Sequence, residues 1–324
     1  MSYSHIKRRL DLGEVLILDG ATGTELQRRG APMDAAAWCG PATLEHHDLL
    51  SEIHVDYIEA GADVVTANTF AASRLMLGAA GLGDRVGEVV ARAVAAAQEA
   101  RKRCGAEARV AVAGSLSHMV PVAAGTDAVD PTQVPSQNAI ADAFHEIAGH
   151  LKSNGVDHIM LEMMYNPNRT PMAVAAAVET GLPVWFGTSA RRGADGTVLA
   201  FDRLEDVPLG DIARMIPKEG IDVSGIMHTG SDLMTEALSV VRDHFGGPLS
   251  AYPDSGYFAA PDWRFVEVID AGALLTFYGS WLENGARLIA GCCGTGLAHV
   301  RAAVAAREQF ERSRNVSGSA SFNS

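Results

Sequence analysis

The sequence predicts an α/β protein built as a single-domain (β/α)8 TIM barrel, and three observations support this fold class. Short apolar runs recur eight times along the 324 residues, and a longer Ala-rich segment with helical spacing follows each run. The runs are nearly continuous in hydrophobicity, which is typical of parallel strands buried on both faces. The competing doubly wound sheet is disfavoured, because no G-x-G-x-x-G sequence follows the first run.

The predicted elements alternate along the chain as a barrel requires. The eight strands are expected at residues 14–20, 63–70, 110–116, 158–164, 183–190, 223–230, 248–254 and 287–294. Helix candidates between and after them include residues 86–104, 136–154, 231–245 and 296–311. The turn sequences EAGAD, SNGVD and ENGAR precede the second, fourth and eighth strands, and each places a glycine where a helix ends. Eight such strand–helix units match the usual length of this fold.

Composition bounds the domain organisation and the partners. Residues 1–311 are expected to form the barrel, and the Ser/Asn/Gly-rich residues 312–324 a disordered C-terminal tail. A net charge of −13 argues against nucleic-acid binding, which needs a basic face. No apolar run approaches the length of a membrane span. Four irregularly spaced cysteines do not make a disulfide framework, so a reducing, cytoplasmic location is predicted, without any indication of the oligomeric state.

The carboxyl ends of the predicted strands carry the residues that can do chemistry. In this fold the active site lies at that face of the barrel. Each predicted strand is apolar inside and has a polar or ligand-type residue towards its end: Asp19, Asn68, Ser115, Glu162, Ser189, His228, Asp254 and the adjacent Cys292 and Cys293. The pattern predicts an enzyme whose site lies at one mouth of the barrel.

Two adjacent cysteines and one histidine form a candidate metal site. Cys292 and Cys293 end the eighth strand in IAGCCGTG, and His228 ends the sixth strand, two positions away around a closed barrel. Two thiolates and an imidazole with one open position match the ligand count of a catalytic zinc ion. The alternative is that the cysteines are inert and that His228 only caps a loop. Cys39 and Cys104 are interpreted as a loop residue and a helix-end residue.

Two acidic residues are the candidate catalytic side chains. Asp19 lies in LDGATGTEL, where glycines let the backbone approach a ligand closely, although a helix N-cap is the alternative role. Glu162 lies inside the apolar run HIMLEMM. A carboxylate there is costly to bury unpaired, so we expect it to meet a cation or hydrogen-bond donors, with a structural arginine as the alternative partner.

The segments LDGATGTEL, GADVVTANTF, YPDSG and GARLIAGCCGT together resemble the homocysteine S-methyltransferase family. The resemblance covers about residues 10–310, and GCCGT is its most specific part. The family includes the enzymes that use S-methylmethionine or betaine and the homocysteine module of methionine synthase. Its fold is a (β/α)8 barrel, which agrees with the strand count reached above.

The resemblance implies a zinc ion held by three cysteines, with a fourth position for the sulfur of homocysteine. Cys292 and Cys293 match two of these cysteines. His228 stands where the third is expected, and Met227 stands where the family has asparagine. Another departure is Asp254, where the family has the asparagine of YPN.

The resemblance also implies which residues hold the amino-acid substrate. Glu162, and Asp19 with Gly20 and Ala21, occupy the positions that bind its ammonium and carboxylate groups. Asn68, at the end of the second strand, completes the predicted substrate-binding set.

The predicted function is zinc-dependent methyl transfer from an onium-type donor to homocysteine or a related thiol, giving methionine. A free thiol is mostly protonated at neutral pH, and coordination to zinc removes the proton and produces the nucleophilic thiolate. S-methylmethionine is the favoured donor, because no folate or cobalamin module is found in the chain.

With histidine in place of the third cysteine, the predicted metal site is less negative than a site of three cysteines. Two alternatives to the methyltransferase function therefore stay open. One is a zinc hydrolase or lyase that uses metal-bound water, with Glu162 or Asp254 as the general base. The other is a non-catalytic relative that binds zinc or an amino acid.

Overall fold

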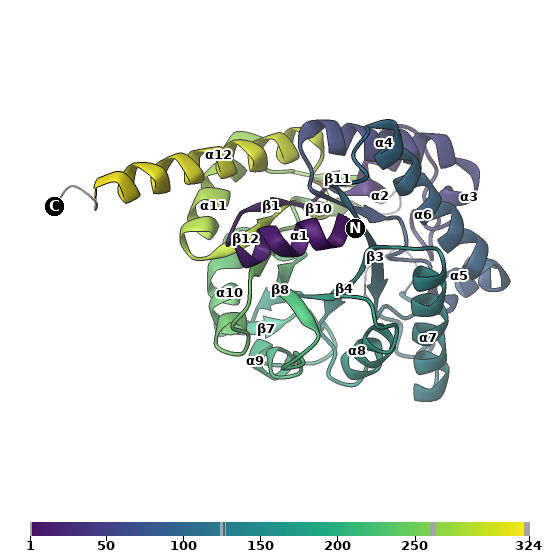
Figure 1. Cartoon of the computed structure of the whole chain (residues 1–324). Helices are drawn as coiled ribbons and strands as arrows, with labels where there is room; N and C mark the ends of the chain where they lie inside the picture. Colours follow the sequence, from purple (N-terminus) through teal and green to yellow (C-terminus); the bar gives the residue numbers. More distant parts are fainter. Residues whose placement is uncertain (1, 124–125, 127, 260–263, 321–324) are drawn as a thin grey trace.

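The computed structural model describes residues 2–123, 126, 128–259 and 264–320, and its central feature is a closed barrel of parallel strands (Figure 1). The prediction of a (β/α)8 barrel is confirmed. Every pair of neighbours in the eight-stranded sheet is parallel. The strands follow the order β1 (Leu16–Ile17), β12 (Ala286–Ile289), β9 (Leu249–Tyr252), β8 (Ile221–Met227), β5 (Val184–Thr188), β4 (His158–Met164), β3 (Ala111–Ser117) and β2 (Val64–Ala67).

The barrel closes between β1 and β2, its first two strands in sequence. Leu18 forms an isolated parallel bridge with Val64. The N–H of Asp63 donates to the carbonyl of Ile17 at 2.7 Å, and the N–H of Asp19 donates to the carbonyl of Val64 at 3.1 Å. These bonds bring the first strand of the chain beside the second and make the ring continuous.

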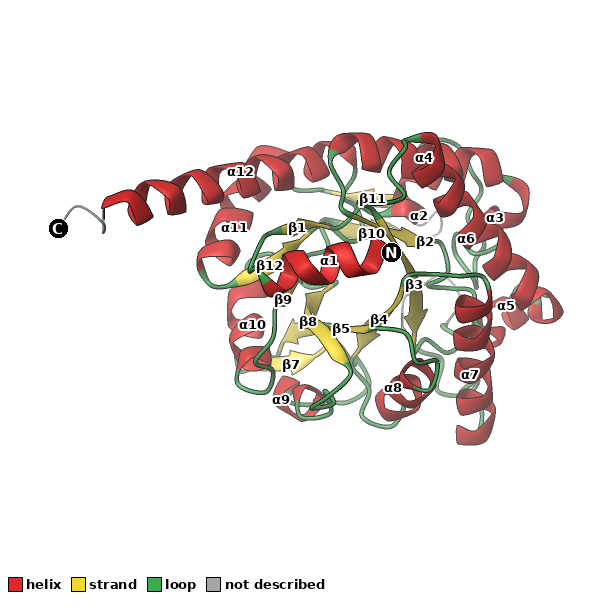
Figure 2. Ribbon diagram, viewed as in Figure 1, coloured by secondary structure: helices red, strands yellow, loops and turns green. Residues whose placement is uncertain are grey.

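The helices form an outer layer around the strands (Figure 2). Their order is α1 (Ser2–Asp11), α2 (Thr22–Arg28), α3 (Ala42–Glu45), α4 (His47–Ala60), α5 (Arg74–Ala79), the 3-10 turn Gly83–Arg85, α6 (Val86–Arg103), α7 (Gln137–Ser153), α8 (Thr170–Val178), α9 (Leu209–Ala213), α10 (Met234–Arg242), α11 (Ala271–Glu283) and α12 (Leu297–Ala320). The helices expected at residues 86–104 and 136–154 are confirmed as α6 and α7. α10 is shorter than the expected 231–245, because residues 230–233 form a turn closed by a bond from the N–H of Leu233 to the carbonyl of Gly230.

Glycines end the helices that precede three strands, as the turn sequences predict. Gly61, Gly155 and Gly285 have φ values of 109°, 78° and 92°, respectively. Backbone in this left-handed region is strained for residues with a Cβ atom, so glycine is the natural residue at these helix ends.

Two short antiparallel hairpins extend from the barrel. β6 (Ala190–Arg192) pairs with β7 (Val198–Ala200) after β5, and β10 (Tyr257–Ala259) pairs with β11 (Arg264–Val266) after β9. Both follow the carboxyl end of a barrel strand, so both add residues to the face that the sequence predicts to be functional.

Helix α1 lies across the opposite end of the barrel (Figure 1). Tyr3 donates its hydroxyl proton to the carboxylate of Asp222 and accepts a hydrogen bond from the indole of Trp185 at 3.0 Å. The ring of His158 lies between them, 5.3 Å from the Tyr3 ring and 4.2 Å from the Trp185 ring. These contacts cover the amino-terminal ends of the strands and leave the carboxyl ends for the site.

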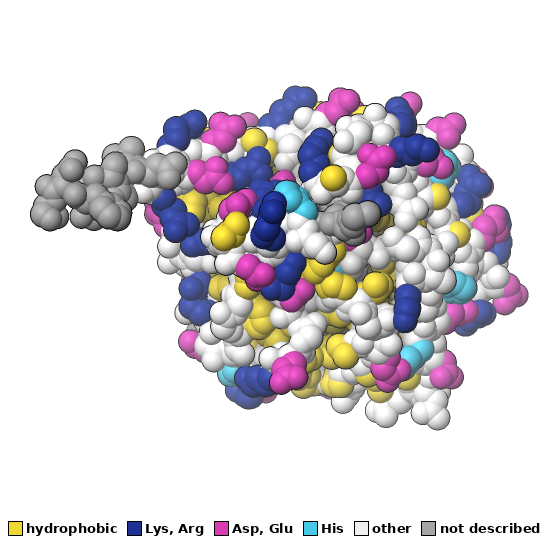
Figure 3. All heavy atoms as spheres, viewed as in Figure 1, with side chains coloured by type: hydrophobic (Ala, Val, Ile, Leu, Met, Phe, Trp, Pro, Cys, Tyr) yellow, Lys and Arg dark blue, Asp and Glu magenta, His cyan; other side chains and the backbone are white. Residues whose placement is uncertain are grey.

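Helix α12 continues past residue 311 to Ala320 and projects from the barrel (Figure 1). Residues 312–320 of the segment expected to be a disordered tail therefore belong to this helix, and residues 321–324 of that segment lie outside the described residues. On the face shown in Figure 3, basic and acidic side chains are interspersed. Within the described ranges, none of the helices is long and apolar enough to cross a membrane.

The carboxylate of Asp63 holds several elements together at the barrel seam. It accepts a hydrogen bond from the N–H of Ile17 at 2.9 Å and pairs with Arg9 of α1 at 2.5 Å and Arg307 of α12 at 2.8 Å. Asp157, just before β4, has the same role beside β3, where it accepts from the N–H of Val112 at 2.8 Å and pairs with Arg101 at 2.6 Å.

Asp63→Asn is expected to lower the free energy of unfolding by about 1–3 kcal/mol, because it weakens charged hydrogen bonds to two arginines in a mostly buried setting. Urea unfolding followed by circular dichroism measures the change. Asp84→Asn is the matched control, since Asp84 is fully exposed and water and salt screen its pair with Arg74, so the substitution should leave the free energy of unfolding nearly unchanged. Equal effects of the two substitutions would contradict the role given to Asp63.

Candidate active site

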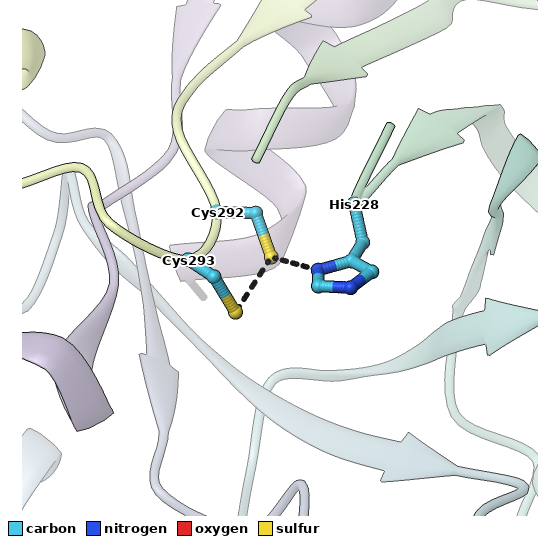
Figure 4. Close-up of side chains that lie close together, drawn as sticks. All are labelled: His228, Cys292 and Cys293. Atoms are coloured by element: carbon cyan, nitrogen blue, oxygen red, sulfur yellow. Dashed lines mark hydrogen bonds between the residues drawn. The ribbon is translucent and has the colours of Figure 1, made fainter. Parts of the chain in front are cut away.

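His228, Cys292 and Cys293 meet at the carboxyl end of the barrel (Figure 4). The Sγ atom of Cys292 lies 3.8 Å from Nδ1 of His228 and 3.9 Å from Sγ of Cys293, and the three ligand atoms all lie within 4.8 Å of one another. The structure thus brings together the three residues that the sequence selects as a metal site.

The segment after β9 links the two halves of this group. The N–H of His228 donates to the carbonyl of Tyr252 at 3.1 Å, and the N–H of Cys292 donates to the carbonyl of Pro253 at 2.7 Å. Because β9 lies between β8 and β12 in the sheet, its carboxyl end fixes both ligand-bearing segments at once.

The arrangement fits a tetrahedral metal ion. Zinc–sulfur bonds of about 2.3 Å at tetrahedral angles place two sulfur ligands about 3.8 Å apart, which matches the separation of the two thiols. The group consists of two soft thiols and one imidazole, the donor types that zinc prefers. Among the described residues it includes no fourth protein ligand, so a coordination position is left for another molecule.

The glycine that follows the cysteines makes this turn feasible. Gly294 has a φ of 78°, and a Cβ atom added to it would collide with the carbonyl oxygen of Ser255. The N–H of Thr295 then donates back to the carbonyl of Cys292 at 3.1 Å. The GCCG segment therefore turns tightly enough for consecutive thiols to face the same space.

A cavity of about 300 Å³ opens above the group and collects the other predicted residues. The residues selected from the sequence that line it are Asp19, Gly20, Ala21, Asn68, Ser115, Glu162, His228, Asp254, Cys292 and Cys293. Ser189 is the exception: it is buried and does not line the cavity. Nearly all of the strand-end residues thus converge on one space.

Asp19 and Glu162 place two buried carboxyl groups in the cavity wall. Asp19 accepts hydrogen bonds from the N–H of Thr66 at 2.7 Å and from its hydroxyl at 3.1 Å, and Glu162 accepts one from the hydroxyl of Ser115. Burial raises the pKa of Asp19 to about 8, with a further contribution from the charge of Glu162. Burial also raises the pKa of Glu162 to about 7, against the opposing effects of Ser115 and His228. A bound cation would stabilise the charged forms of both carboxyl groups and so lower both pKa values.

Gly20 lets the first loop pass close to the core. A Cβ atom at this position would lie 2.9 Å from the hydroxyl oxygen of Tyr57, so no larger residue fits without movement. Ala21, which follows it, begins the turn into α2, and its side chain supplies no cap. The backbone of Gly20 and Ala21 therefore lies at the cavity surface beside Asp19.

Asn68 lines the cavity but also holds the loop that carries Cys39. Its amide donates to the carbonyl of Cys39 and to the hydroxyl of Thr43, both at 2.9 Å, and its Oδ1 accepts from the thiol of Cys39 at 3.0 Å. Cys39 itself lines the cavity, which the sequence does not indicate. Burial raises the pKa of the Cys39 thiol to about 11, so this thiol is a neutral hydrogen-bond donor.

The remaining cysteine, Cys104, lies at the end of α6, as the sequence predicts.

Sequence reasoning missed the apolar wall of the cavity. Trp38 and Phe70 are stacked, with ring centroids 5.3 Å apart, and Phe201 meets the His228 ring edge-on at 5.0 Å. Arg203 also lines the cavity, with its guanidinium over the Phe201 ring. These residues lie in loops, where hydrophobic periodicity carries no signal. In the sequence, the segment FDR at residues 201–203, with its aromatic residue and arginine, was the one signal that could have indicated this wall.

The model of the homocysteine S-methyltransferase family matches residues 16–307, which is most of the chain. The chain belongs to this family. The matched range includes His228, Cys292 and Cys293 and the buried carboxyl groups of Asp19 and Glu162. The family assignment made from the sequence is confirmed, and the protein is a methyltransferase.

Individual relatives cover the whole barrel. Homocysteine S-methyltransferase of Escherichia coli is 28% identical over 92% of this chain and 96% of its own. Selenocysteine methyltransferase of Astragalus bisulcatus is 26% identical over 87% and 89%, respectively. The metallated form of the E. coli homocysteine methyltransferase MmuM has a TM-score of 0.75 at 24% identity and covers 93% of this chain and 99% of that one, which confirms the fold.

The raised pKa of Asp19 predicts a pH-dependent stability of the metal-free protein. Because the folded protein keeps this carboxyl protonated up to about pH 8, whereas the ordinary value is 3.8, it binds more protons than the unfolded chain in that window. The free energy of unfolding therefore falls as the pH rises from about 4 to about 8. Asp19→Asn removes this contribution. As the pH rises through this window, the free energy of unfolding of the variant should therefore increase relative to that of wild type by up to about 1.4 kcal/mol per pH unit.

Urea unfolding at pH 5 and pH 8 on chelator-treated protein measures this gain. Asp84→Asn, a change at an exposed carboxyl, should show the same difference from wild type at both pH values. A constant difference for Asp19→Asn as well would show that Asp19 does not titrate as its burial implies.

Proposed function

We propose that this protein transfers a methyl group from an onium-type donor, S-methylmethionine in the first instance, to the thiol of homocysteine, with zinc at the group formed by His228, Cys292 and Cys293. The observation that carries the proposal is the convergence of this group with two buried carboxyl groups in one cavity of the homocysteine S-methyltransferase barrel. A cytoplasmic location stays part of the prediction.

Zinc would supply the acidity that turns the substrate thiol into a thiolate at neutral pH. The residues of this chain orient the reaction around that sulfur. Cys292 and Cys293 come from one tight turn, His228 comes from the end of β8, and all three line the cavity in which the substrate sulfur would have to bind. The apolar wall keeps water away from the nucleophile, which strengthens electrostatic interactions in the site.

The methyl transfer itself balances without a redox step. The carbon–sulfur bond of the sulfonium donor breaks, its electron pair stays on the donor sulfur, and a new carbon–sulfur bond forms to homocysteine. The thiol proton is released to solvent. With S-methylmethionine as the donor, both products are methionine.

Glu162 and Asp19 would bind the ammonium group of homocysteine, and the backbone of Gly20 and Ala21 would bind its carboxylate. The described partners of the two buried carboxyl groups are Thr66 and Ser115 and include no arginine or lysine, so the two groups suit a cationic ligand. Asn68 would support the same end of the substrate through the loop that it holds. When the ammonium group binds, it favours the charged forms of both acids and lowers the pKa of each.

The metal proposal predicts about one zinc ion per chain. Purified protein, dialysed against buffer free of metal, should retain it when measured by inductively coupled plasma mass spectrometry. Cys292→Ala and Cys293→Ala each remove a ligand and should lower the zinc affinity at least 10- to 100-fold, the cost of losing even an outer-shell partner. Cys104→Ala, at the end of α6, is the control and should leave zinc content unchanged. Unchanged zinc in the Cys292 and Cys293 variants would refute the site.

The histidine ligand gives a second, sharper test. His228→Cys should keep zinc bound and, by making the metal more electron-rich, should leave homocysteine methylation equal to or faster than wild type. His228→Ala removes a ligand and should lower both zinc affinity and turnover. If the cysteine variant holds zinc but loses the native activity, the site activates water or another substrate instead. Full zinc occupancy in His228→Ala would show that His228 is not a ligand.

A further inference from the structure

The turn that contains Cys292 and Cys293 is hydrogen-bonded to α2, the helix that follows the first strand. The hydroxyl of Thr24 accepts a hydrogen bond from the N–H of Gly294 at 3.1 Å. Arg28, one turn further along α2, donates to the carbonyl of Gly294 at 3.4 Å, a longer bond from a half-exposed side chain. Thr24 also lines the same cavity as the two cysteines. A side chain of α2 therefore contacts the backbone of the metal-binding turn.

The bond from Thr24 acts on the peptide group that joins Cys293 to Gly294. At one edge of this group the carbonyl of Cys293 accepts from the N–H of Ser255 at 2.9 Å, and at the other edge the N–H of Gly294 donates to Thr24. Because a peptide group is planar, bonds at opposite edges fix its rotation about the chain. This plane is one of the two that flank the Cα atom of Cys293, so its rotation determines the direction of the Cys293 side chain.

The glycine itself does little to restrict this rotation. Its φ is 78°, and glycine adopts positive and negative φ values about equally readily because it has no Cβ atom. The hydroxyl of Thr24 is the described acceptor for its N–H, and the bond is partly buried. Without that hydroxyl, the peptide group would have to rotate to satisfy its N–H elsewhere, and the thiol of Cys293 would move with it.

We propose that Thr24 is a positioning residue that holds the thiol of Cys293 at the metal site. This inference rests on the proposed function, which places a metal ion at His228, Cys292 and Cys293. Partners outside the ligand set strengthen metal binding because they fix the orientation of a ligand before the metal arrives. Thr24 follows Ala21 by three residues, so one short segment would both bind the substrate carboxylate and orient a metal ligand.

Thr24→Val tests this role, because valine has nearly the shape of threonine and lacks the hydroxyl. The probes are zinc alone, with its affinity measured by competition with a chromophoric chelator, and cobalt(II) alone, whose charge-transfer absorption reports its bonds to thiolates. The variant should bind zinc about 10-fold more weakly, because a partly buried N–H loses its acceptor. The charge-transfer absorption should fall as the bond to Cys293 weakens. Thr24→Ser keeps the hydroxyl and should bind zinc within about twofold of wild type.

Thr180→Val is the matched control. The hydroxyl of Thr180 also accepts a backbone N–H at 3.1 Å, from Leu182, and Thr180 is buried and does not line the cavity. This variant should lower the melting temperature and leave the zinc affinity and the cobalt spectrum as in wild type. Any loss of stability that Thr24→Val shares with Thr180→Val is thereby separated from an effect on the metal site.

Wild-type zinc affinity in Thr24→Val, an equal loss of affinity in Thr180→Val, or no recovery in Thr24→Ser would overturn the role of Thr24. A wild-type protein that binds no zinc would overturn both this role and the proposed function. Both measurements are made without substrates. A protein that binds zinc in the expected order of affinities but forms no methionine would therefore refute the methyl transfer and still support the role of Thr24.

Discussion

Closure of the barrel between β1 and β2 is the constraint on which the site depends. β1 has only two residues in regular pairing, so main-chain bonds from Asp63 and Asp19 and the carboxylate of Asp63 hold the seam. Asp19 takes part in closure through its N–H and in the cavity through its side chain. The bonds that complete the ring therefore also position a carboxyl group in the site. Closure brings the ends of β1 and β2, with Asp19 and Asn68, to the same mouth as the ends of β8 and β12.

The sequence was sufficient to predict the barrel and most of the cavity floor, because both depend on strands. A strand that is buried on both faces is visible as an apolar run, and a polar residue marks its carboxyl end, within the run as with Glu162 or just after it as with His228. The wall formed by Phe201, Arg203 and Cys39 could not be predicted in this way. Those residues are placed by loop contacts such as the bonds of Asp202, which have no period in the sequence.

The electrostatics of the cavity favour the ligands that the chemistry requires. Burial disfavours negative charge in the cavity and so raises the pKa values of both acids, whereas an ammonium group or an onium methyl donor would bring in a cation that stabilises their charged forms. In the proposed site, two thiolates would balance a divalent ion, so the metal would add little net charge. Binding energy from the ammonium end of the proposed substrate could then be used to align its sulfur with the methyl group and so increase the rate.

The backbone conformation at His228 bears on how the side chain at this position can change during evolution. Its φ is 43°, in the left-handed region that costs a residue with a Cβ atom about 1–2 kcal/mol, and its N–H is tied to Tyr252. The main chain, rather than the imidazole ring, thus decides where the side chain points. In the proposed metal site, a lineage could therefore exchange the donor atom at this position while the surrounding architecture stays intact. The reactivity of the bound substrate sulfur would then change through one residue, independently of the evolution of the fold.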